Sequence, residues 1–281
     1  RHISLAPISG LPGELIMRQD YAVNHVGNSI ADEYPFLEAL HRAGLPVAAP
    51  VLLEARHSML GAPFMLVQKL EGKNIGNLWG FFPGTDPKPV CYELARVLAQ
   101  IHSLPANSVA VPGAEKMLSL RERVVLQIDE IHQKWKRGRT STSPVIALAL
   151  LWLRQQLDTG DVVPTLVHGD CAFTNILVHE GRISALLDWE FAHIGDPAED
   201  LAYIRSVVQQ VVPWEAYVDA YCAAGGKAPS DARLHYFDVC RALRNAIYAG
   251  LAGESFLRSD TNYVMLGWAG VYAEPLLEYQ I

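Results

Sequence analysis

One segment of the chain, residues 166–189, combines a sharp turn with three polar side chains at fixed spacing. Two apolar runs, residues 176–178 and 183–187, flank a turn at residues 179–182, and this pattern predicts a β-hairpin. Asn175 precedes the first run and Asp188 follows the second, so both lie at the open end of the hairpin. We therefore expect their side chains to converge on one ion.

The residue types in this segment indicate phosphate chemistry. Asn175 and Asp188 offer hard oxygen ligands, which suit Mg²⁺ bound beside substrate phosphates. Asp170 precedes them on the loop His168-Gly169-Asp170, where its carboxylate can accept a proton from a hydroxyl. The order H-x-D-x-x-x-x-N followed by a later Asp matches the protein-kinase pattern, with Gly169 in place of the usual Arg.

These motifs, with D-W-E at residues 188–190 and G-D-P-A-E-D-L-A at residues 195–202, resemble the aminoglycoside phosphotransferase and choline kinase superfamily. The second run is most similar to the branch found fused or adjacent to acyl-CoA dehydrogenases. The resemblance covers the chain from about Leu15 onward. It implies an α+β, protein-kinase-like two-lobed fold, with a small β-rich N-lobe and a larger, mostly helical C-lobe that carries the catalytic hairpin.

The resemblance also implies the nucleotide-binding residues. A basic residue on an N-lobe strand reaches the α- and β-phosphates and a helix Glu holds it, and Arg18 and Glu33 occupy those places. Most relatives carry Lys there, and Arg differs because its guanidinium is a planar, bidentate fork. The acyl-CoA-dehydrogenase-associated branch often shows Arg. The alternative is a surface Arg that pairs with any nearby acid.

The connection between the predicted lobes offers a place for adenine. Residues 64–70 are predicted as a strand that leads into Glu71-Gly72, the position of a kinase hinge. We expect adenine to bind backbone groups there, the Gln68 carbonyl and the Leu70 N–H. The alternative is a simple transition from strand to loop.

The chain is expected to divide near residue 72, into a nucleotide-binding N-lobe (residues 1–72) and a catalytic, substrate-binding C-lobe (residues 73–281). Hydrophobic periodicity and breaker residues predict the elements. In the N-lobe they are strands at 15–18, 51–54 and 64–70 and a helix at 31–43. In the C-lobe they are helices at about 90–103, 116–136, 145–157, 198–210, 214–224, 231–252 and 262–279.

The N-lobe is expected to be incomplete near the phosphate flap. Ser9-Gly10 is similar to the start of the family's flap and is assigned to the cofactor site, but two strands and a loop do not fit before Arg18. We predict that residues are missing near Gly10. The alternative is a naturally short flap and a weakened ATP site.

Composition excludes several functions. Half of the residues are hydrophobic and the formal net charge is −7, a poor basis for binding nucleic acid. The four cysteines form no C-x-x-C pair, so free thiols in a reducing compartment are expected. No apolar run approaches the roughly 20 residues that span a bilayer, and we expect a cytoplasmic protein without a membrane partner. The oligomeric state stays open.

The prediction is an ATP- and Mg²⁺-dependent phosphotransferase acting on a hydroxyl of a small molecule, which is aminoglycoside-, choline- or hydroxyacyl-like. Asp170 is the catalytic carboxylate, and Asn175 and Asp188 are the metal ligands. One alternative is a catalytically silent, kinase-like nucleotide-binding module. Another is a metal-dependent hydrolase that uses His168, Asp170, Asp188 and His193, which Asn175 argues against because Asn is a poor zinc ligand.

Neighbouring polar residues have expected roles as well. We interpret His168 as a packed residue that orients the loop, and the resemblance suggests that Asp200 braces the loop through hydrogen bonds. Glu190 and Asp196 are hypothesised to influence the acceptor. Residues 195–197 could instead be only a turn that starts the next helix.

Overall fold

The structure is a computed structural model that describes residues 2–4, 13–20, 29–56, 60–77, 80–106, 118–138 and 143–258. By compactness the chain divides into two units. The first comprises Arg1–Met117 and Thr165–Ala228, and the second comprises Leu118–Pro164 and Pro229–Ile281. The predicted boundary near residue 72 lies inside the first unit, and the assignment of separate lobes on either side of it stays a prediction.

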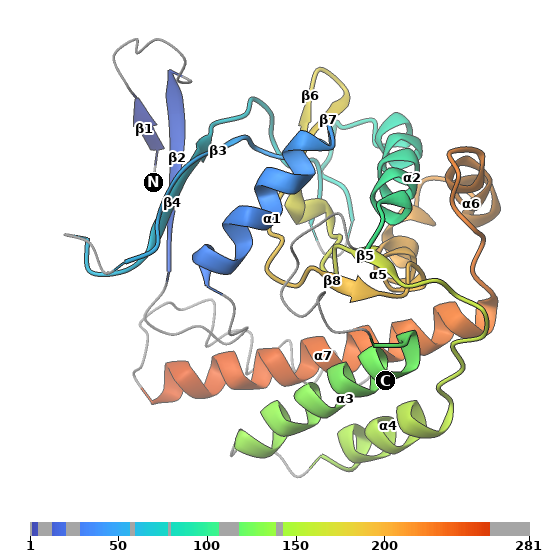
Figure 1. Ribbon diagram of the computed structural model, residues 1–281. Coiled ribbons are helices and arrows are strands. Elements are labelled where there is room, and N and C mark those ends of the chain that lie inside the picture. Colours follow the sequence, from blue (N-terminus) through green and yellow to red (C-terminus); the bar gives the residue numbers. More distant parts are fainter. Residues whose placement is uncertain are drawn as a thin grey trace. The chain divides into compact units, whose positions relative to one another are not determined.

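A four-stranded antiparallel sheet begins the first unit (Figure 1). Its strands are β1 (His2–Ser4), β2 (Glu14–Gln19), β3 (Pro50–Glu54) and β4 (Phe64–Gln68), in the order β1-β2-β4-β3. Leu15 and Met17 of β2 are buried, and the alternation along the strand turns Arg18 to the opposite face. Among the described residues, one strand precedes the strand that carries Arg18.

Helix α1 (Ile30–Arg42) packs against β3 and β4. It begins at a capping box, in which the Ser29 side chain accepts the backbone N–H of Ala31 and the Asp32 carboxylate accepts the N–H of Ser29. Phe36 and Leu40 form its buried face together with Glu33, which is also buried. The helix therefore carries one acid into the interior of the unit.

The rest of the first unit is mostly helical and holds the predicted hairpin. Helix α2 (Lys88–Ser103) packs against α6 (Trp214–Ala223) and β5 (Thr165–Val167), and α5 (Ala198–Val208) contacts α6. Strands β6 (Ile176–His179) and β7 (Arg182–Leu186) form the hairpin. Glu180 and Gly181 at its tip both have positive φ, 48° and 75°, as a two-residue type I′ turn requires.

Two short elements of this region were not predicted. Strand β8 (His193–Gly195) pairs with β5, and a 3₁₀ turn, η1 (Phe173–Asn175), precedes the hairpin. Each has three residues, too few to show a hydrophobic period. Both elements are nevertheless important, because they fix the two loops that carry the polar residues of the site.

The second unit consists, in its described part, of three helices. They are α3 (Leu120–Arg137), α4 (Pro144–Gln155) and α7 (Asp231–Leu257), and each packs against the other two. Ser119, Ser143 and Ser230 cap their N-termini. The predicted helix at 262–279 lies outside the described residues. Within the described part of the chain, every helix is too short or too polar to cross a membrane.

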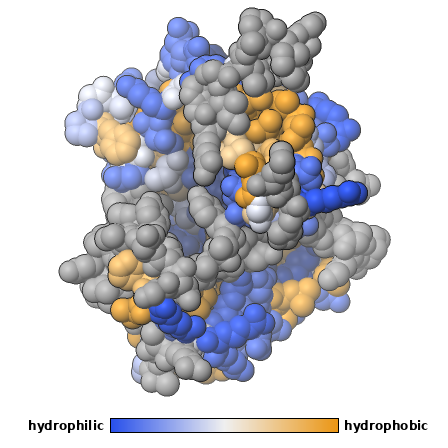
Figure 2. Space-filling model, turned by 90° about the vertical axis from the view of Figure 1, so that its left-hand side faces the viewer, coloured by the Kyte–Doolittle hydropathy of each residue, from blue (hydrophilic) through white to orange (hydrophobic). Residues whose placement is uncertain are grey.

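The described surface is mixed in character. Exposed large hydrophobic side chains include Leu148 and Leu151 of α4 and Leu257 of α7, and on the face shown in Figure 2 hydrophobic patches are interspersed with hydrophilic ones. The four cysteines are free, as predicted, and Cys91 and Cys171 are buried. The burial raises the pKa of the Cys171 thiol, so this neighbour of Asp170 is held as an inert thiol.

Candidate active site

The loop His168-Gly169-Asp170 leaves β5 with a conformation that needs glycine. Gly169 has φ +78°, in the left-handed region, and a Cβ there would lie 2.5 Å from the backbone oxygen of Phe191. A side chain at this position would therefore be both strained and in collision. The local geometry therefore favours glycine at position 169.

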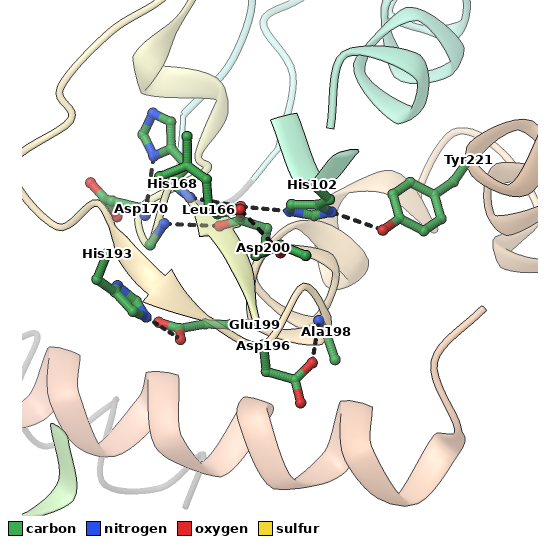
Figure 3. A network of polar contacts seen from close by, with 12 residues as sticks. His102, Leu166, His168, Asp170, His193, Asp196, Ala198, Glu199, Asp200 and Tyr221 are labelled. Atoms are coloured by element: carbon green, nitrogen blue, oxygen red, sulfur yellow. Dashed lines mark hydrogen bonds and ion pairs between the residues drawn. The ribbon is translucent and has the colours of Figure 1, made fainter. Parts of the chain in front are cut away.

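Asp200, near the start of α5, holds this loop by its backbone (Figure 3). Its two carboxylate oxygens accept the N–H groups of His168 and Gly169, at 2.8 and 2.9 Å. The side chain is fully buried. Burial opposes ionisation, but the hydrogen bonds from the His102 ring and from the His168 backbone outweigh it and hold the pKa of Asp200 below its usual value. These contacts support the predicted bracing role.

His168 connects the loop to the residue before Asp188. Its Nδ1 accepts the backbone N–H of Asp170 at 3.2 Å, and its Nε2 donates to the carbonyl of Leu187 at 3.0 Å. The ring also packs on Trp189, with centroids 4.4 Å apart. Both nitrogens are therefore used, which agrees with the interpretation of His168 as an orienting residue.

Asp170 and Asn175 are in direct contact. The Asn175 side-chain nitrogen donates to Oδ2 of Asp170 at 2.8 Å and to its backbone oxygen at 3.0 Å. The turn between them is fixed by the Asn74 side chain, which donates to the carbonyls of Thr174 and Ile176. With its nitrogen engaged by Asp170, the Asn175 amide keeps its oxygen as a ligand.

The backbone places Asn175 and Asp188 at the open end of the hairpin. The Leu187 N–H donates to the carbonyl of Asn175 at 2.7 Å, continuing the β6–β7 ladder. Asp188 then adopts φ 62°, a left-handed conformation that is uncommon for Asp and typical of functional positions. That the two side chains converge on one ion stays a prediction.

Arg18 meets both Glu33 and Asp188. Its guanidinium forms a hydrogen-bonded ion pair with Glu33, and Nη2 lies 3.8 Å from Oδ1 of Asp188. Burial works against the charge, but Glu33 more than compensates and raises the pKa of Arg18. The Trp189 N–H also donates to Glu33. The predicted pair, Arg18 on a strand and Glu33 on a helix, thus lies beside Asp188 at the open end of the hairpin.

Negative charge is in excess around Arg18. Burial, reinforced by Arg18's acidic neighbours Asp188 and Glu33 and by Asp170, raises the pKa of Glu190 to about 7. The pKa of Asp188 is raised by burial and by Asp170, against the effect of Arg18. One guanidinium interacts with three carboxylates here, those of Glu33, Asp188 and Glu190, so a further cation would stabilise the ionised cluster.

Two parts of the predicted nucleotide site remain, the hinge and the phosphate flap, and the structure describes only the hinge. Gln68 ends β4, and its N–H donates to the Ala49 carbonyl. Within the described residues the Leu70 N–H has no hydrogen-bond partner, which leaves it available to a ligand. Ser9 and Gly10, with the prediction of missing residues beside them, lie outside the described residues.

The polar residues after Asp188 have structural partners. His193 donates from Nδ1 to the Phe191 carbonyl at 2.8 Å and pairs through Nε2 with Glu199 at 3.2 Å. Asp196 is buried, and its carboxylate accepts the N–H of Ala198 at the start of α5. This favours the turn interpretation of residues 195–197.

The sequence matches one family model over most of its length. The model describes a phosphotransferase enzyme family, and it matches residues 9–237. The chain belongs to this family. Together with the loop, hairpin and ion pair described above, this confirms the resemblance read from residues 166–203.

The relatives confirm the branch as well. The chain is 29% identical to acyl-CoA dehydrogenase family member 11 of Pongo abelii and to that of Homo sapiens, over 89% of its own length in each comparison. It spans about a third of the length of these relatives, 32% in both.

Solved structures establish the fold as kinase-like. A putative aminoglycoside phosphotransferase from Ralstonia eutropha jmp134 is similar with a TM-score of 0.74 and 22% identity, over 95% of this chain and 84% of that one. A ternary complex of a thermostable mutant of aminoglycoside phosphotransferase APH(4)-Ia with ADP and hygromycin B gives a TM-score of 0.63 and 17% identity, over 100% of this chain and 94% of that one.

Proposed function

We propose that this phosphotransferase moves the γ-phosphoryl group of ATP to a hydroxyl of a small molecule, with Asp170 as the catalytic carboxylate. The observation that carries the proposal is the contact of Asp170 with Asn175, on a loop whose backbone is fixed by Asp200 and His168. The Asp170 carboxylate, the Asn175 amide and the Asp188 carboxylate follow one another in the sequence as the catalytic carboxylate and the two metal ligands of kinases do.

Asp170 acts on the acceptor. The acceptor oxygen forms a bond to the γ-phosphorus while the bond from that phosphorus to the β,γ-bridging oxygen breaks, and ADP leaves. Asp170 orients the acceptor hydroxyl and takes its proton late in this step. Since Oδ2 is engaged by Asn175, the hydroxyl is expected to bind the other carboxylate oxygen.

Asn175 and Asp188 are proposed to hold Mg²⁺. The residues fit this ion because both supply oxygen ligands and because the surrounding carboxylates outnumber the one guanidinium. When bound, the ion neutralises charge on the phosphates. Asn175 has a second function that needs no ion, which is to orient Asp170 through its amide nitrogen.

Arg18 and Glu33 are proposed to position the nucleotide. The ion pair fixes the guanidinium close to Asp188, so that its remaining donors can bind the α- and β-phosphates. The Leu70 N–H and the carbonyl of Gln68 are proposed to bind adenine. Likeness to solved structures that contain ADP or GDP supports a nucleotide site.

The hydrolase alternative is disfavoured by the geometry of its two histidines. Both nitrogens of His168 and both nitrogens of His193 are occupied by protein partners. In the part of the chain that the structure describes, no three His, Cys, Asp or Glu side chains come together as a metal-binding group.

The test combines nucleotide binding with turnover. Binding of ATP and GTP is measured by calorimetry with Mg²⁺, and phosphorylated product is then sought by mass spectrometry across aminoglycosides, choline-like amines and hydroxyacyl compounds. We expect ATP binding and one productive acceptor class. Binding without any transfer, in the presence of all three classes, would support the silent module, and absence of nucleotide binding would overturn the proposal.

A further inference from the structure

A chain of buried polar groups runs behind the catalytic loop (Figure 3). His102, near the C-terminus of α2, lies with Nε2 3.1 Å from Oδ2 of Asp200 and with Nδ1 2.8 Å from the hydroxyl of Tyr221 on α6. His102 and Tyr221 are buried, at 7% and 1% exposure, and Asp200 is completely buried. Three helices thus contribute one side chain each to a continuous network.

The hydrogen-bonding roles within this network follow from the charge on Asp200. An ionised carboxylate only accepts, so Nε2 of His102 must carry the proton that faces it. In a neutral imidazole Nδ1 is then an acceptor, and the Tyr221 hydroxyl is the donor that satisfies it. Tyr221 therefore selects the tautomer of His102 that can donate to Asp200.

The buried Asp200 carboxylate accepts its hydrogen bonds from protein groups and not from solvent. Oδ1 accepts the Gly169 N–H, and Oδ2 accepts both the His168 N–H and the His102 ring. If His102 loses its donor, a buried charge is left with fewer partners, and such charges are costly. The carboxylate would then shift or take up a proton, and either change loosens its hold on the loop.

We propose that His102 and Tyr221 are positioning residues for phosphoryl transfer. Neither contacts the reacting groups. They act through Asp200, which fixes the His168 and Gly169 backbone and thereby the carboxylate of Asp170. The inference rests on the proposed function only in its effect on turnover. Its structural content, that this network orders the catalytic loop, is independent of the acceptor.

The test uses four variants of the full chain. His102→Leu removes both ring nitrogens at similar volume, whereas His102→Gln keeps an N–H donor near the place of Nε2. Tyr221→Phe removes only the hydroxyl. Tyr236→Phe is the matched control, because it deletes another buried tyrosine hydroxyl bond, 3.0 Å to the Leu153 carbonyl, in the second unit.

Two quantities are measured in each variant. Amide hydrogen exchange is followed in the peptide that contains residues 166–172, and kcat and KM for Mg-ATP are measured with the acceptor found in the screen. In His102→Leu we expect exchange of the loop to accelerate about tenfold and kcat to fall on the order of 10²-fold with KM for ATP unchanged. Tyr221→Phe should show smaller changes in the same direction.

Rescue and control decide the outcome. His102→Gln should recover most of the loop protection and of kcat, and Tyr236→Phe should leave both at wild-type values. Loop exchange in Tyr221→Phe and His102→Leu that matches Tyr236→Phe would overturn the inference, as would equal losses in His102→Gln and His102→Leu. If the wild-type protein transfers no phosphoryl group, the proposed function fails while the exchange result still decides this inference.

Discussion

The acceptor half and the nucleotide half of the candidate site are held in place in different ways. Asp170 sits on a loop whose backbone N–H groups are bound by buried side chains, Asp200 and His168. Arg18 is held by ion pairs between side chains, with Glu33 and, at 3.8 Å, with Asp188, and its own side chain is 33% exposed. A loop held by its backbone is insensitive to salt, whereas a partly exposed ion pair is screened.

The way in which each half is held suits its role in the reaction. The proton acceptor has to stay within hydrogen-bond distance of its substrate, and small misplacements reduce the rate strongly. A phosphate-binding guanidinium has to exchange one anionic partner for another as nucleotide enters and leaves. We therefore expect changes in the acceptor half to reduce kcat and changes in the nucleotide half to raise KM for ATP.

The largest effect is expected for Asp170→Asn. The amide cannot take the acceptor proton, and positioned proton acceptors contribute on the order of 10²–10⁴ in rate. ATP binding should stay nearly intact, because the carboxylate serves the acceptor. Single-turnover kinetics and calorimetry measure the two quantities. Near-normal turnover in the purified variant would remove Asp170 from its assigned role.

Gly169→Ala tests how rigid the acceptor half is. The left-handed φ costs a non-glycine residue about 1–3 kcal/mol, and the added methyl would also meet the Phe191 oxygen at 2.5 Å. Gly181→Ala is the matched control, since Gly181 has φ +75° but nothing within 4 Å of its added Cβ. Urea unfolding should show a larger loss for Gly169→Ala.

The activity of these two variants extends the comparison. Gly169→Ala should lower kcat because the collision displaces the loop, whereas Gly181→Ala should lower stability alone. If the two variants lose equal stability and keep equal kcat, the loop accommodates the methyl group, and the rigid picture of the acceptor half is wrong.

Glu33→Gln tests the nucleotide half. The ion pair with Arg18 is lost, but the side chain keeps its size and one hydrogen-bonding oxygen. We expect KM for ATP to rise on the order of tenfold, about 1.4 kcal/mol, with kcat little changed. Steady-state kinetics at low and high salt provide the measurement. A fall in kcat at constant KM would contradict the division between the halves.

The sequence was most informative where spacing and local pattern agree. The hairpin, the positions of Asn175 and Asp188 at its open end, and the strand and helix that carry Arg18 and Glu33 all follow from short-range signals. The pairing of Arg18 with Glu33 came from the resemblance, because the two residues are distant in sequence and no periodicity connects them.

His102 shows why the rest could not be predicted. In the sequence it is one polar residue near the end of an apolar helix, where a histidine usually packs without a special role. Its partners Asp200 and Tyr221 lie 98 and 119 residues away. Only tertiary packing brings them together, and the three-residue strand β8 likewise depends on its pairing with β5.

The smallest effect concerns pH and compares two His–Glu pairs. His193 pairs with Glu199 in a buried setting, 22% and 11% exposed. Burial lowers the pKa of His193, but Glu199 outweighs it, so the pKa is raised above its usual 6.5. A raised folded-state pKa gives stability that is complete below about pH 6.5 and is lost as pH rises through the folded value. Each pKa unit corresponds to about 1.4 kcal/mol.

Glu199→Gln removes the charge that raises this pKa, so the decline in unfolding free energy above pH 6.5 should become shallower. His179→Asn is the control, because His179 forms a comparable pair with Glu71, at 3.1 Å, on the exposed hairpin, and surface pairs contribute little. Urea titrations from pH 6 to pH 9 measure the slopes. A Glu199→Gln slope equal to wild type would show that Glu199 does not raise the pKa of His193, and the buried pair would then affect the pH dependence of stability no more than the exposed His179–Glu71 pair does.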